Sequence, residues 1–468
     1  MGTTITNNPK RAEPKAVAAA VEKLAARFGN RLVTSQAVRD QHAHTTTWLQ
    51  SQPPDAVVFA QETADVQDVV RICASQGVPV IAFGTGTSLE GQVNAPAGGV
   101  CIDFRDMNKV LEVHAEDLDA VIQPGVTRKA LNEHLRDQGV FFPIDPGADA
   151  SLGGMASTRA SGTNAVRYGT MRENVLALKV VRGDGEIITT GTRAKKSSAG
   201  YDLTHLFVGA EGTLGIITEL TIKLRGIPET IAAAACSFDS VRGACQATIM
   251  AIQTGIPVAR IELLNAEQVK ACNSYSKLSL PETPLLLLEF HGSEADVAEQ
   301  SRNFAEIATE CGGGDFTWTT RPEDRTKLWQ ARHDVYWAVK ALRPGAGAVA
   351  TDVCVPISRL AECIVATRAD LDRASFPAVM VGHVGDGNFH VQCLLAPEQT
   401  SEADAFAERL VERAQGMGGT CTGEHGVGSG KKKYLEAEHG EALEVMRTLK
   451  RALDPDNRMN PGKVLDVN

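Results

Sequence analysis

Three glycine-rich segments in the first half of the chain limit its fold more than any other feature of the sequence. They are 84–91, which follows an apolar strand pattern, 145–170, which holds several glycines among short polar residues, and 209–218, which precedes a strand pattern. Glycine lets the backbone turn tightly and approach a ligand closely, with its N–H groups directed outward toward an anion. Three such loops in one region favour a large, extended ligand that carries phosphate.

The first of these segments matches neither of two common nucleotide-binding motifs. In GTGTSLEG (84–91), the third glycine of a Rossmann motif would fall on Leu89. A P-loop is excluded as well, because no lysine followed by serine or threonine comes after it. Taken alone, this segment is explained equally well as a tight turn, and a flexible surface loop would explain 145–170.

Short strand and helix patterns alternate through 53–225, which indicates an α+β or α/β domain. After residue 226 the helical patterns become longer, and strand patterns such as 285–292 and 378–395 separate them. We therefore predict a second α+β domain with an antiparallel sheet.

Composition excludes several classes of protein. The formal net charge of −10 argues against non-specific binding to nucleic acid, which requires a basic surface. The 10 cysteines include no CxxC pair, so we expect buried thiols in a reducing compartment. The sequence contains neither a run of about 18 apolar residues nor an apolar signal block at its start. We expect a cytoplasmic protein, and leave peripheral contact with the inner membrane open.

The segment 378–395 gives the strongest indication of chemistry. Asp386-Gly387 is typical of a two-residue hairpin turn, and folding the strands about it places His383 directly opposite His390. Their Cβ atoms would then lie roughly 5 Å apart on one face, which suits two imidazoles that share a metal ion. A hydrogen-bonded pair of histidines without a metal is the alternative explanation.

The motif GEHGVG (423–428) offers a third ligand and a base. Glu424 supplies a carboxylate, and two histidines with one carboxylate are typical of a catalytic metal site with an open position. Zinc, manganese, iron and cobalt suit this set of ligands, with zinc and manganese favoured. Only one of two adjacent residues needs to bind the metal, so His425 is predicted to be a general base.

Together, these motifs resemble the vanillyl-alcohol-oxidase-type flavoproteins, in the branch with an FAD-linked oxidase C-terminal domain. PDAVVF (54–59) and TDVCVP (351–356) extend the likeness over nearly the whole chain, and it is greatest to the cytochrome-type D-lactate dehydrogenases. The resemblance implies a two-subdomain FAD-binding domain over 1–225. It further implies an α+β substrate domain with the metal site over 226–445, and a segment, 446–468, that returns to the FAD domain.

The resemblance also implies the residues of the site. The relatives' metal ligands fall on His383, His390 and Glu424, their base falls on His425, and the arginine that binds the substrate carboxylate falls on Arg332. Relatives that attach the flavin covalently use a histidine in the first loop, and 84–91 contains none, so non-covalent FAD is implied. The residues implied to contact FAD are Gly84, Thr85, Gly86, Thr87, Ser88, Leu89, Pro146, Gly147, Ser151, Gly153, Gly154, Ser157, Gly162 and Ile217.

The implied reaction is the oxidation of a D-2-hydroxy acid, with D-lactate to pyruvate favoured, by metal-assisted proton removal and hydride transfer to the flavin. Relatives that act on D-2-hydroxyglutarate carry a lysine where this chain has Ala350, so a substrate with one carboxylate is expected. Cytochrome c, a quinone or an electron-transfer flavoprotein would accept the electrons. A homodimer is left open.

Other functions stay open on the sequence alone. A glycolate oxidase flavin subunit or a D-2-hydroxyglutarate dehydrogenase would have nearly the same site. A zinc hydrolase could use His383, His390 and Glu424 with a water molecule, but it would leave the three glycine-rich segments unexplained. Flavin absorbance in the purified protein separates the hydrolase from the other functions.

Overall fold

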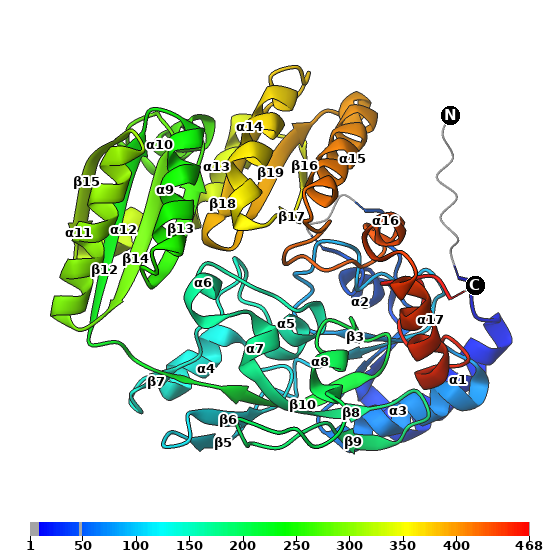
Figure 1. Cartoon of the computed structure of the whole chain (residues 1–468). Helices are drawn as coiled ribbons and strands as arrows, with labels where there is room; N and C mark the ends of the chain where they lie inside the picture. Colours follow the sequence, from blue (N-terminus) through cyan, green and yellow to red (C-terminus); the bar gives the residue numbers. More distant parts are fainter. Residues whose placement is uncertain (1–8, 46–48, 468) are drawn as a thin grey trace. The chain divides into compact units, whose positions relative to one another are not determined.

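The computed structural model describes residues 9–45 and 49–467, and its chain divides into two compact units (Figure 1). Unit 1 takes the chain up to Ser161, then Thr170–Gly226, and again from Glu424 onward. Unit 2 consists of Gly162–Gly169 and Ile227–Gly423. The chain therefore returns to unit 1 at residue 424, and not at the expected residue 446.

A small, largely parallel sheet forms the first half of unit 1. Its strands are β1 (Leu32–Val33), β2 (Ala56–Phe59), β3 (Val80–Phe83) and β4 (Val100–Asp103), in the order β1-β2-β4-β3. The last three run parallel and are almost continuously apolar, as expected for strands that are buried on both faces. The helices α1 (Pro14–Phe28) and α3 (Thr63–Gln76) pack on this sheet, and α2 (Gln36–Gln41) lies beside β2.

An antiparallel sheet forms the second half of unit 1. Its order is β5-β6-β10-β8-β9, with β5 (Val110–His114), β6 (Asp119–Ile122), β8 (Val175–Val181), β9 (Ile187–Thr189) and β10 (Ile216–Lys223). Alternate residues of β6 and β10 enter an apolar core that α4 (Arg128–Leu135) and α5 (Leu152–Thr158) complete. The short elements here are β7 (Val140–Phe141), β11 (Arg225–Gly226), α7 (Met171–Asn174) and α8 (Leu203–Phe207).

Unit 2 is built on an eight-stranded sheet in the order β15-β12-β14-β13-β18-β19-β16, with β17 paired to β19. All of its strand pairs are antiparallel, which confirms the predicted α+β fold class with an antiparallel sheet. The strands are β12 (Thr230–Phe238), β13 (Val258–Leu264), β14 (Leu285–Gly292), β15 (Gly313–Thr319), β16 (Gly347–Ala350), β17 (Val353–Cys354), β18 (Ala378–His383) and β19 (Asn388–Leu395).

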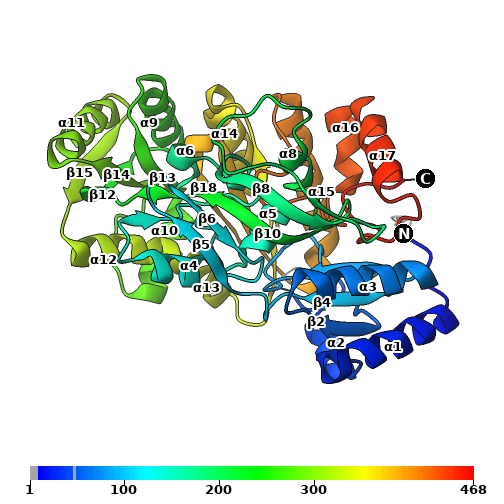
Figure 2. The same ribbon diagram turned by 90° about the horizontal axis from the view of Figure 1, so that it is seen from below.

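Two groups of helices cover the faces of this sheet (Figure 2). One group is α9 (Val241–Gln253), α11 (Glu294–Glu310), α14 (Leu360–Leu371) and α15 (Thr400–Gly416). The other is α10 (Ala266–Ser276), α12 (Pro322–His333) and α13 (Val335–Leu342). The central strands β13 and β14 are therefore buried, and LLLL at 285–288 lies at most 2% exposed inside unit 2.

A short piece of the second glycine-rich segment belongs to unit 2. Gly162–Gly169, which includes α6 (Ala165–Tyr168), lies against β13. Arg260 Nε donates to Asn164 Oδ1 at 2.8 Å, and the Tyr168 hydroxyl bonds to His291 Nδ1 at 2.7 Å. These long-range bonds explain why this piece belongs to unit 2, although its neighbours in the sequence belong to unit 1.

The C-terminal part of unit 1 contains α16 (Leu435–His439) and α17 (Ala442–Leu453). Lys450 of α17 is 5% exposed, and its Nζ donates to Asp454, to Thr213 O at 2.8 Å and to Met459 O at 3.0 Å. No cysteine among the described residues forms a disulfide, and eight of the ten are buried as expected, while Cys311 and Cys354 are partly exposed. Among the described helices, none combines the length and the apolar character that crossing a bilayer requires.

We predict that Lys450→Met destabilises the protein, because it leaves the Asp454 carboxylate buried without its cation. Removing one partner of a buried ion pair costs about 3–5 kcal/mol, which corresponds to a fall in melting temperature of roughly 3–10 °C. Circular dichroism during heating measures this change. Lys129→Met, at an exposed lysine, is the control, and an unchanged melting temperature for Lys450→Met would contradict the prediction.

Candidate active site

The three glycine-rich segments meet around α5 in unit 1. The backbone N–H of Ser151, the residue before α5, donates to Thr85 Oγ1 at 3.4 Å. At the other end of the helix, Gly209 N–H donates to Ala156 O at 2.9 Å, and Glu211 N–H donates to Ser157 O at 2.9 Å. Segments that lie far apart in the sequence thus contact one another around one short helix.

Close packing of these loops explains several of the glycines. A Cβ atom on Gly84 would lie 2.1 Å from Ser151 Oγ, and one on Gly153 would lie 2.4 Å from Pro124 Cβ. Gly86 has a φ of +68°, in the left-handed region that favours glycine. Glycine is therefore needed at these positions for the loops to meet.

Two hydroxyl groups in these loops fit a polar ligand such as FAD. Ser88 Oγ and Ser151 Oγ are buried, and neither has a hydrogen-bond partner among the described residues. Buried polar atoms without a partner are rare in folded proteins, and a bound ligand is one way to satisfy them. The loops therefore fit a cofactor with many hydrogen-bonding groups.

The other predicted FAD residues lie in or beside these loops, with one exception. Thr87, Leu89, Pro146 and Gly147 are loop residues of unit 1. Gly154 and Ser157 lie in α5, and Ile217 lies in β10. Gly162 is the exception, because it belongs to the piece of chain in unit 2.

The two predicted metal-binding histidines come together in unit 2, but in a different register from the predicted one. Val381, and not His383, lies opposite His390 across β18 and β19. The predicted two-residue turn is wrong: Val384–Asp386 form a 3₁₀ turn, followed by Gly387 at a φ of +79°. A shift of two residues leaves side chains on the same face, so the two imidazole rings still lie 5.5 Å apart between centroids.

Each histidine ring is oriented through its Nδ1 atom. His383 Nδ1 lies 2.7 Å from Glu262 Oε1, and His390 Nδ1 lies 3.1 Å from the backbone oxygen of Thr351. Histidines that bind metals commonly use one ring nitrogen for a carboxylate or a carbonyl oxygen and the other for the metal. Both rings therefore have the arrangement expected of metal ligands that bind through Nε2.

Glu262 also joins the first histidine to the predicted substrate-binding arginine. It is fully buried on β13, and its Oε2 accepts a hydrogen bond from Arg332 Nε of α12 at 2.7 Å. Burial acts to raise the pKa of Glu262, but the charges of His383 and Arg332 outweigh it, so the pKa is lowered. Sequence reasoning missed Glu262, which stands within the apolar strand VARIELL.

The chain that leads to Glu424 is held beside the histidines. Asp352 accepts hydrogen bonds from Asn388 Nδ2 at 2.7 Å and from Thr422 Oγ1 at 2.8 Å. A Cβ atom on Gly423 would lie 2.1 Å from Asn388 Nδ2, so the backbone just before Glu424 touches the strand that carries His390. Asp352 and Asn388 were not predicted either.

Glu424 is bonded directly to Gly423, the last residue of unit 2. Glu424 itself begins the chain's return to unit 1, and its carboxylate is the third predicted donor after His383 and His390. Two imidazoles and one carboxylate form a donor set that suits zinc or manganese. The three predicted ligands therefore fit one divalent metal.

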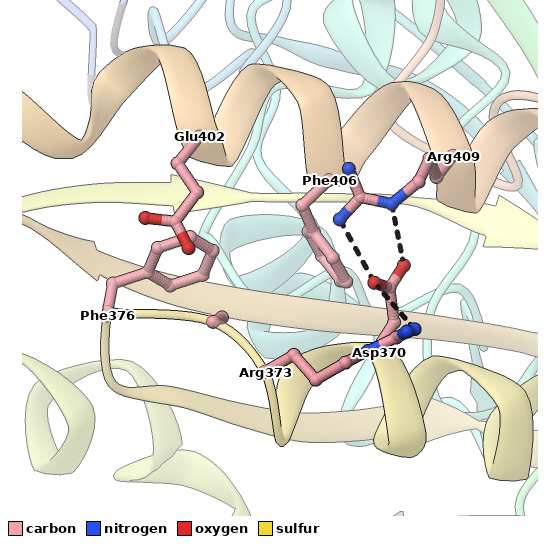
Figure 3. A pocket seen from close by; sticks show the side chains of 7 residues that line it. Asp370, Arg373, Phe376, Glu402, Phe406 and Arg409 are labelled. Atoms are coloured by element: carbon pink, nitrogen blue, oxygen red, sulfur yellow. Dashed lines mark hydrogen bonds and ion pairs between the residues drawn. The ribbon is translucent and has the colours of Figure 1, made fainter.

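A hollow between α14 and α15 does not belong to this site (Figure 3). Its volume is about 310 Å³, and two of its charged residues pair with each other, since Asp370 binds Arg409 at 3.0 Å. Phe376 and Phe406 supply its apolar wall. None of the predicted site residues lines it.

Comparison with known proteins identifies the family. Residues 227–464 match the family of FAD linked oxidases, C-terminal domain, and residues 54–191 match an FAD binding domain. The chain belongs to this family of FAD-linked oxidoreductases. The predictions of the family, of FAD as cofactor and of an oxidoreductase are therefore confirmed.

Relatives with curated names cover most of the chain. A probable D-lactate dehydrogenase of Danio rerio is 52% identical over 96% of this chain and 93% of its own. A cytochrome-type D-lactate dehydrogenase of Arabidopsis thaliana is 46% identical over 88% and 73%. The glycolate oxidase subunit GlcD of Bacillus subtilis is 34% identical over 92% and 93%.

Solved structures support the fold. p-Cresol methylhydroxylase matches with a TM-score of 0.80 and 18% identity, over 97% of each chain. 4-Ethylphenol oxidase from Gulosibacter chungangensis matches with a TM-score of 0.78 and 20% identity, over 97% of this chain and 98% of its own. These likenesses confirm the vanillyl-alcohol-oxidase-type fold.

The expected cytoplasmic location is wrong. The relatives from Danio rerio, Arabidopsis thaliana, Kluyveromyces lactis and Saccharomyces cerevisiae are all named as mitochondrial. The expectation depended on free cysteines and on the lack of an apolar signal block. Those features separate oxidising from reducing compartments, and they do not distinguish between reducing ones.

We predict that Glu262→Gln weakens metal binding by roughly 10–100-fold, because His383 loses the carboxylate that orients its ring. Elemental analysis after dialysis against graded concentrations of a chelator measures the affinity, and flavin absorbance reports the FAD content. Glu289→Gln is a matched control, since this buried glutamate of β14 pairs with His291 at 2.7 Å. Wild-type metal affinity in Glu262→Gln would show that the contact does not support a metal site.

Proposed function

We propose that this protein oxidises a D-2-hydroxy acid with one carboxylate, and that its preferred substrate is D-lactate, which becomes pyruvate. The observation that carries this proposal is the buried network of Arg332, Glu262 and His383, which sets a carboxylate-binding cation beside a histidine pair. Such a site suits a substrate with a carboxylate next to a hydroxyl group. The D-lactate dehydrogenases that are 52% and 46% identical support the choice of substrate.

Arg332 and His425 would act directly on the substrate. Arg332 uses Nε to bind Glu262, and its two Nη groups form the part of the guanidinium that can bind a carboxylate as a fork. His425 would take the proton of the substrate hydroxyl as a general base. The substrate thereby loses two electrons and two protons and becomes a 2-oxo acid.

FAD would be held non-covalently by the three glycine-rich segments, since 84–91 contains no histidine to attach it. His383, His390 and Glu424 would hold one divalent metal, zinc or manganese. When bound, FAD supplies the acceptor for the two electrons, and the metal supplies a positive charge that lowers the pKa of the substrate hydroxyl.

Ala350 supports a substrate with a single carboxylate. It lies opposite Gln392 across β16 and β19, and Gln392 follows His390 by two residues on the same strand. Alternate residues of a strand share a face, so Ala350 lies on the face that carries His390. A second substrate carboxylate near this methyl group would lack a cation and would bear a large desolvation cost.

A cytochrome is the electron acceptor that we favour over a quinone or an electron-transfer flavoprotein. The relatives from Arabidopsis thaliana and Kluyveromyces lactis, 46% and 40% identical, are named as cytochrome-type enzymes.

Steady-state kinetics with one artificial electron acceptor tests the proposed function. kcat/KM would be measured for D-lactate, L-lactate, glycolate, D-2-hydroxybutyrate and D-2-hydroxyglutarate. The proposal requires D-lactate or D-2-hydroxybutyrate to have the highest value. A preference for glycolate would indicate a glycolate oxidase subunit, and a preference for the dicarboxylate would overturn the single-carboxylate site.

We predict that His425→Asn lowers kcat by roughly 10²–10⁴-fold, because a general base contributes an effect of that size. Asparagine keeps a polar side chain of similar size, so the contents of FAD and metal should stay at the wild-type level. Stopped-flow absorbance of the flavin measures the rate of the chemical step. An effect confined to KM would assign His425 to substrate binding instead.

We predict that Ala350→Lys shifts the preference toward D-2-hydroxyglutarate, because it adds a cation on the face that carries His390. kcat/KM for the dicarboxylate should rise relative to that for D-lactate by about tenfold or more, the size of one charge-assisted contact. Ala350→Met is the control for added bulk without charge. Equal changes in the two variants would contradict the placement of residue 350.

A further inference from the structure

A second buried glutamate binds the backbone of the loop that follows Glu424. Glu211 lies in the third glycine-rich segment and is 5% exposed. Its Oε1 accepts a hydrogen bond from the backbone N–H of Val427 at 2.7 Å, and its Oε2 accepts one from the N–H of Gly428 at 2.9 Å. One carboxylate thus binds two successive N–H groups directly after His425 and Gly426.

Gln92 holds the same loop through His425 itself. Its Nε2 donates to the backbone oxygen of His425 at 2.8 Å, and its Oε1 accepts the N–H of Glu90 at 2.9 Å. Gln92 directly follows the first glycine-rich segment. Two side chains, one in the third glycine-rich segment and one directly after the first, therefore hold three backbone groups of the loop 425–428.

Gly426 is the residue that lets both side chains come this close. Its φ is +79°, and a Cβ atom there would lie 2.5 Å from Glu211 Oε1 and 2.9 Å from Gln92 Nε2. A side chain at position 426 would displace one contact or both. The close contacts of Glu211 and Gln92 with the loop therefore explain why a glycine follows His425.

The backbone of Glu211 is itself fixed in an unusual conformation. Its φ of 51° lies in the left-handed region, which is unfavourable for a residue other than glycine. Asn460 Nδ2 donates to Glu211 O at 2.7 Å and to Gln92 O at 3.1 Å. Such strain persists where several contacts determine the conformation together.

Opposing effects act on the pKa of the buried Glu211 carboxyl. Burial raises the pKa of Glu211 to about 7, while its two backbone N–H partners and the charge of Lys463 act to lower it, and Glu90 acts to raise it. Lys463 is 2% exposed and donates to Asn94 O at 2.6 Å. An ionised carboxylate binds N–H groups roughly twice as strongly as a neutral acceptor does.

We propose that Glu211 is a positioning residue for the reaction: by holding the loop 425–428, it sets the place of the His425 ring. Gln92 is its partner on the other side of the loop. This inference rests on the proposed function, because that function makes His425 the base.

Amide hydrogen exchange tests the placement without any turnover. The FAD-loaded protein would be compared with Glu211→Gln, in which an amide group replaces the second acceptor oxygen. Exchange in a peptide spanning 425–430 should become at least tenfold faster, since the loop loses a charge-assisted hydrogen bond. Unchanged protection of this peptide would overturn the inference, whatever the substrate is.

Two further variants control this experiment. Asp119→Asn changes another carboxylate of unit 1 that is 2% exposed, one that pairs with His114 and Arg193, and should leave the exchange of 425–430 unchanged. Gly426→Ala disturbs the contacts of Glu211 and Gln92 with the loop and leaves the carboxylate in place. If Glu211→Gln does not fold, faster exchange of 425–430 in Gly426→Ala supports the inference, and unchanged exchange overturns it.

Kinetics then tests whether Glu211 acts through His425. Glu211→Gln should lower kcat for D-lactate by roughly 10–100-fold while KM changes by less than about threefold, as expected for a misplaced base. The double variant Glu211→Gln with His425→Asn should be no slower than His425→Asn alone. Additive losses would overturn the inference. A wild-type protein that oxidises no 2-hydroxy acid would refute the proposed function, and the exchange result would still decide the placement.

Discussion

The carboxylate of Glu262 is the interaction on which the candidate site most depends. An ionised carboxylate without partners would cost several kcal/mol to bury, and here His383 and Arg332 both bind it at 2.7 Å. The Glu262 carboxylate thereby orients both side chains. The ring that would bind the metal and the cation that would bind the substrate carboxylate keep a fixed separation, which a reaction at the carbon between them requires.

The antiparallel sheet of unit 2 makes this contact available. Glu262 lies directly opposite His383 across β13 and β18, and β14 on the other side of β13 is buried and apolar. A packed strand on one side and a helix, α12, on the other leave the carboxylate little freedom. In unit 1, Glu211 has a comparable place, since it binds two backbone N–H groups of the loop that carries His425.

The sequence predicts those parts of the molecule that depend on local patterns. Strand alternation and glycine-rich turns are local, so the α+β class and the presence of the three glycine-rich loops could be predicted. The histidine pair was found although its register was wrong by two residues. A Cβ atom on Gly387 would lie 2.1 Å from Val355 O, so the chain near β17 packs against the turn and reshapes it. Such a long-range contact leaves no local signal.

The residues that support the site could not be predicted for the same reason. Glu262 and His383 are 121 positions apart in the chain, and Glu262 stands in an apolar strand where a glutamate has no evident role. Glu211 stands in a glycine-rich segment from which only Ile217 was assigned to the cofactor. The return of the chain to unit 1 at Glu424 depends on the contacts of Gln92 and Glu211, which are just as distant in sequence.

Anaerobic mixing of the FAD-loaded protein with D-lactate tests the central claim most directly. Without an electron acceptor, the absorbance of the oxidised flavin should disappear in a single turnover, and more slowly when the C2 hydrogen of D-lactate is replaced by deuterium. L-lactate at the same concentration should leave most of the flavin oxidised. A flavin that stays fully oxidised with D-lactate would contradict the account.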